Sequence, residues 1–239
     1  MRLQDLIFTG SKTAMGTWPE KKFLIDTVNT HSFVIAQEDA SFAEALLSAD
    51  ALIPDGIGIV KGAKWLHLPH APKEKIAGAD LFAYEMERLN TRGGTCFFLG
   101  SSQATLDAIC AKSATVYPNI HVKTYSPPYK KEFSEEDNQA MIQAVNQADP
   151  DLLWIGMTAP KQEKWLHQNW NHLHINCHAG CIGAVFDFFA GTVPRAPEWW
   201  QEHDLEWLYR LFKEPSRMWR RIFVSGPIFI VLLIKERFS

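Results

Sequence analysis

The sequence predicts an α/β protein built on a doubly wound, mostly parallel sheet of the Rossmann-like type. Short apolar runs alternate with segments of helical apolar spacing, and several apolar runs stop abruptly at glycine or a polar residue. With 239 residues, 46% of them hydrophobic, the chain can bury a large core. We expect one α/β domain over residues 1–194 and a helical C-terminal appendage over residues 195–239.

The first β-α-β unit is expected near the N-terminus. Residues 23–27 are typical of a buried strand that runs into a polar turn at 28–32. Residues 41–48 have helical apolar spacing, with Ser41 as the expected N-cap, and a second strand starts at Ala51.

The alternation then continues to the last third of the chain. Helices are expected at 79–90, 103–116 and 134–147 and after Pro160, and strands at 95–99, 120–125, 152–156 and 175–178. Strands that alternate with helices at this spacing favour parallel neighbours joined by crossover helices.

Asp55 is the first candidate functional residue, because its strand ends abruptly at Pro54-Asp55-Gly56. Thr27 and Asn29 leave the end of the preceding strand. In a parallel sheet all three residues leave the same carboxyl edge, where open α/β folds bind ligands. A plain β-turn at Asp55 is the alternative.

Two helix starts at the same edge could receive an anion. Gly100-Ser101-Ser102 opens one helix, although such a turn is also an ordinary helix start. After Pro160, the side chains of Lys161 and Gln162 occupy a helix N-terminus that we expect to face the crevice, where a diphosphate would be stabilised.

Three other patterns are weaker. His174, Cys177, His178 and Cys181 have the spacing of a zinc cluster, but neighbouring residues of a strand point to opposite faces. Asp149-Pro150-Asp151 precedes its strand and so lies at the amino edge. Gly56-x-Gly58 lacks the third glycine of a dinucleotide site. We therefore expect neither a metal nor a cofactor.

Charge and cysteine content favour a cytoplasmic protein. The net charge of −3 gives no reason to expect a nucleic-acid partner, and the residues before Gly16 contain no apolar run like that of a secretory signal. The four cysteines lie in apolar segments, as buried reduced thiols do. They are Cys96, Cys110, Cys177 and Cys181.

The C-terminal segment is electrostatically distinct. Residues 207–239 carry a net charge of +5, which leaves −8 for the preceding part. Residues 222–234 are an uncharged run of 13, shorter than the roughly 20 residues a spanning helix needs. Arginines precede that run at helical spacing, which favours docking on an anionic membrane surface. The alternative is that the apolar face packs on the main domain. The arginines are Arg210, Arg217, Arg220 and Arg221.

With these residues identified, the sequence resembles the WecG/TagA/CpsF glycosyltransferases, which form glycosyltransferase family 26. The resemblance spans nearly the whole chain and rests on many motifs in the same order. They are Thr27-x-Asn29, Ile53-Pro54-Asp55-Gly56-Ile57-Gly58, Ile76-Ala77-Gly78-Ala79-Asp80, Phe98-Leu99-Gly100, Pro160-Lys161-Gln162-Glu163, Phe186-Asp187-x3-Gly191, Arg195-Ala196-Pro197, Leu205-Glu206-Trp207-Leu208-Tyr209-Arg210-Leu211 and Glu214-Pro215-x-Arg217.

The resemblance implies metal-independent, inverting transfer of a sugar from a UDP-sugar to a polyprenyl-diphosphate-linked saccharide. Family donors are N-acetylmannosamine, its uronic acid or other hexoses, and the enzymes act at the inner face of a bacterial membrane. A homo-oligomer is possible. A strand-end carboxylate suits the base that such a reaction needs, and helix N-termini with a lysine suit its diphosphate leaving group.

The resemblance also assigns roles to individual residues. Asp55 is the expected base, with Thr27 and Asn29 positioning the reacting sugar. Arg210, Arg217, Arg220 and Arg221 are assigned to the membrane or the diphosphate. Substrate-binding residues are expected at Gly56, Lys75, Gly78, Asp80, Gly100, Pro160, Lys161, Gln162, Glu163, Gly180 and Asp187.

Two departures from the family pattern affect the pocket. His178-Ala179-Gly180-Cys181 stands where relatives commonly have Gly-Val-Gly-Gly, and Lys75 stands where they often have arginine, so a bidentate phosphate contact would be lost there. Two other functions are compatible with this sequence. One is a nucleotide-dependent oxidoreductase on a similar sheet, and the other is a membrane-docked sensor of sugar nucleotides.

Overall fold

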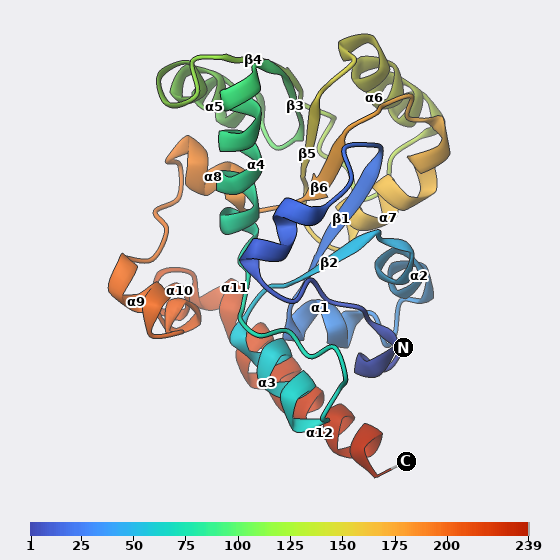
Figure 1. Cartoon of the computed structure of the whole chain (residues 1–239), viewed down its shortest axis with the longest axis vertical. Coiled ribbons are helices and arrows are strands. Elements are labelled where there is room, and N and C mark those ends of the chain that lie inside the picture. The colour runs from blue at the N-terminus through green and yellow to red at the C-terminus, as the bar shows by residue number, and fades with distance from the viewer. Residues whose placement is uncertain (239) are drawn as a thin grey trace. The chain divides into compact units, whose positions relative to one another are not determined.

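Six strands form the sheet of the computed structural model, which describes residues 1–238 apart from the side chain of Arg217 (Figure 1). The strands are β1 (Phe23–Val28), β2 (Ala51–Pro54), β3 (Gly94–Gly100), β4 (Ile120–Tyr125), β5 (Leu152–Gly156) and β6 (His178–Cys181). Their order is β2-β1-β6-β5-β3-β4, and β6 runs parallel to β1 and β5, as β3 does to β4 and β5. The predicted fold class is confirmed.

The chain divides into two compact units. The first contains Met1–Thr17, Thr27–Ala77 and Arg195–Ser239, and the second contains Trp18–Asp26 and Gly78–Pro194. The boundary expected at residue 194 is therefore the point where the chain passes from the second unit to the first. The C-terminal segment belongs to the same unit as Asp55.

The second unit has helices on both sides of its strands. These helices are α4 (Gly78–Arg92), α5 (Gln103–Val116), α6 (Glu135–Ala148), α7 (Lys161–Asn169) and α8 (Val185–Ala190). Figure 1 shows α4, α5 and α8 on one side and α6 and α7 on the other. At the centre, the ring of the fully buried Trp154 lies 5.6 Å from that of Phe82 and against Gly180, where a Cβ atom would overlap it. Gly180 therefore has a packing role of its own.

The first unit is built around a separate hydrophobic core. Its helices are α1 (Thr30–Ile35), α2 (Ala40–Ser48), α3 (Ile57–Trp65), α9 (Glu198–Glu202), α10 (Glu206–Lys213), α11 (Pro215–Arg220) and α12 (Gly226–Arg237), with a π-helical turn η4 (Arg221–Ser225) and short 3-10 turns at Leu3–Asp5 and Lys12–Thr17. Phe229 and Leu233 of α12 belong to this core, and the rings of Phe33 and Phe229 meet edge to face at 5.5 Å. The C-terminal helix is thus part of the fold of this unit.

The other face of the C-terminal helices is exposed. It carries the exposed apolar side chains Trp219, Phe223, Val224, Ile228, Ile230, Val231 and Ile234. None of the helices described for residues 1–238 is both long enough and apolar enough to cross a membrane.

Three expected elements differ from the structure. The polar turn expected at 28–32 is mostly the start of helix α1, with Asn29 as its N-cap. The next helix begins at Ala40 with Asp39, and not Ser41, as the N-cap, since Asp39 accepts from the backbone N–H of Phe42 at 3.0 Å. The last strand is displaced from 175–178 to His178–Cys181, where Gly180 is required beneath Trp154. Helix α3 was not among the expected elements. It contains Gly58 and Gly62, which are unfavourable in a helix interior and weaken the sequence pattern that would predict it.

Candidate active site

Asp55 lies where β2 ends, beside the end of β1. Its backbone N–H donates to the carbonyl of Val28 at 2.9 Å, so the two strand ends are adjacent within the first unit. Gly56 follows with a φ of 106°, a left-handed conformation that favours glycine, and is the N-cap of α3. The Pro-Asp-Gly sequence therefore ends the strand, turns the chain and starts a helix, leaving the carboxyl of Asp55 at the edge.

Asn29 is held in one orientation by the helix that it caps. Its Oδ1 accepts from the backbone N–H groups of His31 and Ser32, both at 3.0 Å, while its own N–H donates to Oγ of Ser32 at 2.8 Å. With Oδ1 occupied by two donors, the amide nitrogen is left to donate, and the side chain hydrogen-bonds to Asp55. Asn29 thus orients the carboxyl of Asp55.

The surroundings of Asp55 act on its pKa in opposite directions. Burial of the carboxyl raises the pKa, and the carboxylate of Glu206 adds to this rise. The hydrogen bond from Asn29 and the charges of Arg210 and Arg221 lower it, but the net direction is upward. A carboxylate whose pKa is raised toward neutral pH is a better proton acceptor than an exposed one.

Helix α10 brings both signs of charge to Asp55. Glu206 and Arg210 are one helical turn apart, and both interact electrostatically with Asp55. Nη2 of Arg195 lies 3.9 Å from Glu206, and Nε of Arg195 is buried without a hydrogen-bond partner. Glu206 and Arg195 have no assigned role among the site residues expected from the sequence, but their motifs predict that the C-terminal segment folds back toward the crevice and brings an arginine to the diphosphate, and Glu206 and Arg210 do act on Asp55.

The remaining expected residues of the first unit are more varied. Thr27 is the next-to-last residue of β1 and is half-buried. Lys75 donates to the carbonyl of Gln201 at 2.8 Å and pairs with Asp204, so its ammonium is held by the last turn of α9 and the residues that follow it. Arg220 is exposed, Arg221 is half-buried, and the side chain of Arg217 lies outside the described part of the structure.

In the second unit, the expected phosphate-binding residues at the start of α7 have protein partners. Nζ of Lys161 donates to the carbonyl of Lys130 and lies 3.4 Å from the ring centroid of Phe133. Gln162 is buried. Its Oε1 accepts from the N–H of Met157 at 3.1 Å, and its Nε2 donates to Glu163 at 2.8 Å. These contacts fix the turn that follows β5.

The other expected residues of this unit lie at the ends of helices and strands. Gly78 and Asp80 open α4, and Pro160 is the N-cap of α7. Gly100 ends β3 with a φ of 122°, and a Cβ atom there would meet the carbonyl of Gly156. Asp187, in the first turn of α8, accepts from Oγ1 of Thr192 at 3.4 Å.

The residues with metal-like spacing are engaged in other contacts. Nδ1 of His178 lies 3.0 Å from Oε1 of Glu85, and its Nε2 lies 3.0 Å from the carbonyl of Pro19. Asp151 accepts from the N–H of Thr95 at 2.8 Å, in the turn before β5. In the part of the chain that the structure describes, no three His, Cys, Asp or Glu residues are grouped as metal ligands would be.

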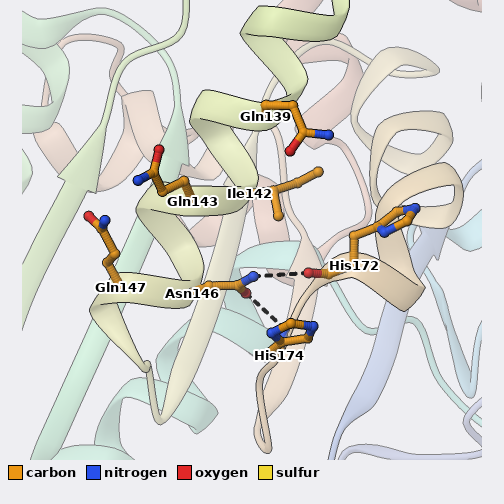
Figure 2. A pocket seen from close by; sticks show the side chains of 7 residues that line it. All are labelled: Gln139, Ile142, Gln143, Asn146, Gln147, His172 and His174. Carbon is orange, nitrogen blue, oxygen red and sulfur yellow. Dashed lines mark hydrogen bonds between the residues drawn. The ribbon is translucent and has the colours of Figure 1, made fainter.

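The second unit has a hollow of about 540 Å³ beside α6 (Figure 2). Asn146 of α6 donates to the carbonyl of His172 at 2.9 Å and accepts from the N–H of His174 at 2.8 Å, which closes its base. The hollow runs along α6, from Gln139 to Gln147. The lining is Gln139, Ile142, Gln143, Asn146, Gln147, His172 and His174.

Comparison with known proteins matches the chain to one family. Residues 9–239 match the model of the glycosyl transferase WecG/TagA/CpsF family. An N-acetylglucosaminyldiphosphoundecaprenol N-acetyl-beta-D-mannosaminyltransferase of Bacillus subtilis (strain 168) is 31% identical over 213 residues, which cover 89% of this chain and 79% of that protein. A protein of the same name from Bacillus spizizenii is 30% identical over 216 residues, covering 90% of this chain and 80% of the relative. These matches confirm the resemblance, and the chain belongs to the WecG/TagA/CpsF family of glycosyl transferases.

Proposed function

We propose that this glycosyltransferase moves an N-acetylmannosamine-type sugar, or a related hexose, from a UDP-sugar to a polyprenyl-diphosphate-linked saccharide, with inversion and without a metal. The single observation that carries the proposal is the carboxyl of Asp55, oriented by Asn29 and set among Arg210, Arg221 and Glu206. The names of the relatives support a diphosphopolyprenol-linked acceptor.

The reaction requires one proton transfer and one displacement. An acceptor hydroxyl oxygen attacks the anomeric carbon, Asp55 takes the hydroxyl proton, and the bond from that carbon to the UDP oxygen breaks. Attack opposite to the leaving group inverts the configuration. Asp55 must be ionised but not strongly acidic, which its opposing neighbours provide, and Thr27 and Asn29 orient the sugar beside it.

The leaving diphosphate needs positive charge as the bond breaks. Arg210 and Arg221 supply it, with Arg217 and Arg220 close along the chain, so no metal is needed for this step. We assign donor binding to Gly56, Lys75 and Asp187, and to the buried Gln162 and Glu163 the fixing of the turn that follows β5. The other members of the expected set are Gly78, Asp80, Gly100, Pro160, Lys161 and Gly180.

We place the protein in the cytoplasm, at the inner face of the membrane that holds its acceptor. The support is the exposed apolar face of η4 and α12, together with Arg220 and the neighbouring basic residues. One face of α12 packs in the core, so the packing alternative accounts for Phe229 and Leu233 but not for exposed Phe223 and Ile230. Helix α12 is apolar on its exposed face as well as on its packed face, and it is too short to span, which favours shallow insertion beside the basic residues that precede it.

The experiment that tests the proposal is transfer of labelled sugar to a lipid acceptor. Purified protein is incubated with UDP-N-acetylmannosamine and a polyprenyl-diphosphate-linked N-acetylglucosamine, and the product is extracted and its anomeric linkage determined by NMR. The β-linked disaccharide from an α-linked donor is expected. Binding of UDP-sugar with no transfer to any lipid-linked acceptor would contradict the proposal.

A further inference from the structure

The imidazole of His31 joins the first turn of α1 to the C-terminal segment. Nδ1 of His31 lies 2.8 Å from Oγ of Ser225, the last residue of the π-helical turn η4. Ser225 is only 5% exposed, so its hydroxyl would lose its partner if His31 were removed. Two residues further along α1, Phe33 packs on Phe229 of α12. Figure 1 shows α1 beside the start of the last helices.

The imidazole is neutral in this setting. Burial, together with the charges of Arg221 and Arg220, lowers the pKa of His31 to about 4. These two arginines are the charged groups that act on the ring. A neutral ring has one donor and one acceptor nitrogen, so it forms an ordinary hydrogen bond with a serine hydroxyl at neutral pH.

His31 also belongs to the network around Asp55. Its backbone N–H donates to Oδ1 of Asn29, whose amide is hydrogen-bonded to Asp55. Arg221, whose charge acts on Asp55, is the first residue of the same π-helical turn that Ser225 ends. Asp55 is therefore linked to Asn29, Asn29 to His31, and His31 to Ser225. Ser225 ends the π-helical turn that Arg221 begins, and the charge of Arg221 acts on Asp55.

The π-helical turn explains why such an anchor matters. A π-helix has a wider turn than an α-helix and occurs mostly in single turns, frequently at functional sites. The direction in which Arg221 projects depends on how that turn is fixed. Ser225 and Phe229 follow Arg221 by four and eight residues, and both are fixed against α1.

We propose that His31 is a positioning residue, which through Ser225 fixes the π-helical turn so that the guanidinium of Arg221 lies beside Asp55. This inference rests on the proposed function, because it requires Asp55 to be the base and Arg221 to stabilise the leaving diphosphate. His31 itself takes no proton from the substrate. Its contribution is to set the charge next to the base and the leaving group.

Two pairs of variants test this role. His31→Leu and Ser225→Ala remove the hydrogen bond, whereas His31→Asn and Ser225→Thr retain a group that can donate and accept at about the same place. We expect the first pair to lower kcat about tenfold with KM for the UDP-sugar within about threefold, because a mispositioned arginine weakens stabilisation of the transition state. The second pair recovers most of this loss. The double variant His31→Leu/Ser225→Ala is no worse than either single variant.

The pH profile separates positioning from a general loss of structure. Arg221 lowers the pKa of Asp55, so its displacement shifts the acid limb of kcat/KM to higher pH in His31→Leu and Ser225→Ala. Ser48→Ala, which removes a hydroxyl that donates to the carbonyl of Ala45 in α2, is the matched control and leaves the limb in place.

The outcomes distinguish this inference from the proposed function. An unshifted acid limb and unchanged kcat in Ser225→Ala and His31→Leu, with Asp55→Asn inactive, would overturn the positioning role and leave the proposed function intact. If His31→Leu does not fold, Ser225→Ala and Ser225→Thr decide. Full turnover of Asp55→Asn would instead overturn the proposed function.

Discussion

Asp26 of β1 and Glu163 of α7 form a pair of interacting carboxyl groups in the interior of the second unit. They are 1% and 2% exposed, and Oδ1 of Asp26 and Oε2 of Glu163 are each buried without a hydrogen-bond partner. Burial raises the pKa of Asp26 to about 7 and, with the charge of Asp26, raises that of Glu163 to about 8. The nearby thiol of Cys181 hydrogen-bonds to Asp26. Ionising both groups would place two negative charges close together in the interior, which costs free energy, so the pair retains a proton at neutral pH.

This pair predicts that the protein loses stability as the pH rises. Both pKa values are higher in the folded state than the roughly 4 of an unfolded chain, so the folded state holds protons that the unfolded state releases. The contribution is complete below about pH 4 and is lost as the pH rises toward 8, by up to about 1.4 kcal/mol per pH unit for each proton.

Urea unfolding at pH 5, 6.5 and 8 checks this prediction. Asp26→Asn and Glu163→Gln should each flatten the pH dependence of the free energy of unfolding, because the amide cannot ionise. Asp107→Asn, which changes an exposed carboxyl on α5, is the control and should keep the wild-type slope. Wild-type slopes in both interior variants would show that the pair does not hold the proton.

A second prediction concerns the core of the first unit. Phe229→Ala and Leu233→Ala should lower the free energy of unfolding by about 2–5 kcal/mol, since each empties a buried site on α12. Ile230→Ala, on the exposed face of the same helix at 57% exposure, should change it by less than about 1 kcal/mol. Equal effects of all three would mean that α12 does not pack on α1 and α3.

A third prediction concerns membrane docking. The double variant Phe223→Ser/Ile230→Ser and the single variant Arg220→Glu should each reduce flotation with liposomes that contain anionic lipid, since each basic residue near such a surface contributes about 1 kcal/mol. Ile7→Ser is the matched control, because Ile7 is an exposed apolar residue near the N-terminus and lies outside η4 and α12. Substitutions are preferred to truncation because removal of α12 would expose the core around Phe33. Flotation that is the same in all variants would refute docking through this face.

A fourth prediction concerns metal ions. Transfer should continue at a rate within about twofold of the untreated enzyme after excess EDTA, because arginines supply the positive charge at the diphosphate. Loss of activity on chelation, with recovery on adding magnesium or manganese, would show that a carboxylate pair such as Asp149 and Asp151 has a role that its place before β5 does not suggest.

The sequence predicted the parts of the fold that depend on local patterns. The apolar runs at β1, β3 and β5 and the periodic helices α4 to α6 lie within a few residues of their expected bounds. Since parallel strands end at one edge, the strand ends also brought Asp55 and Asn29 together correctly. The local pattern predicts a turn in place of helix α1 because Thr30, His31 and Ser32 are polar, and the apolar residue Phe33 packs on Phe229 of the distant helix α12.

The long-range parts of the site could not be predicted from local patterns. Glu206, Arg210 and Arg221 act on Asp55 across more than 150 residues of chain, and no spacing rule links them to β2. Gln162 looked like an exposed ligand at a helix N-terminus but is buried by Met157 and Glu163. Asp26 is a carboxylate in the middle of the apolar strand β1, a local pattern that indicates a buried ionisable group.

The most direct test of the account is the turnover of Asp55→Asn with the lipid-linked acceptor. The amide keeps the shape of the carboxyl and can still hydrogen-bond to Asn29 but cannot take the acceptor proton, so kcat should fall by about 10²–10⁴-fold while the affinity for UDP stays within about threefold. Calorimetric titration with UDP in parallel shows that the donor site is intact. Wild-type turnover in this variant would contradict the assignment of Asp55 as the base, and with it the central claim.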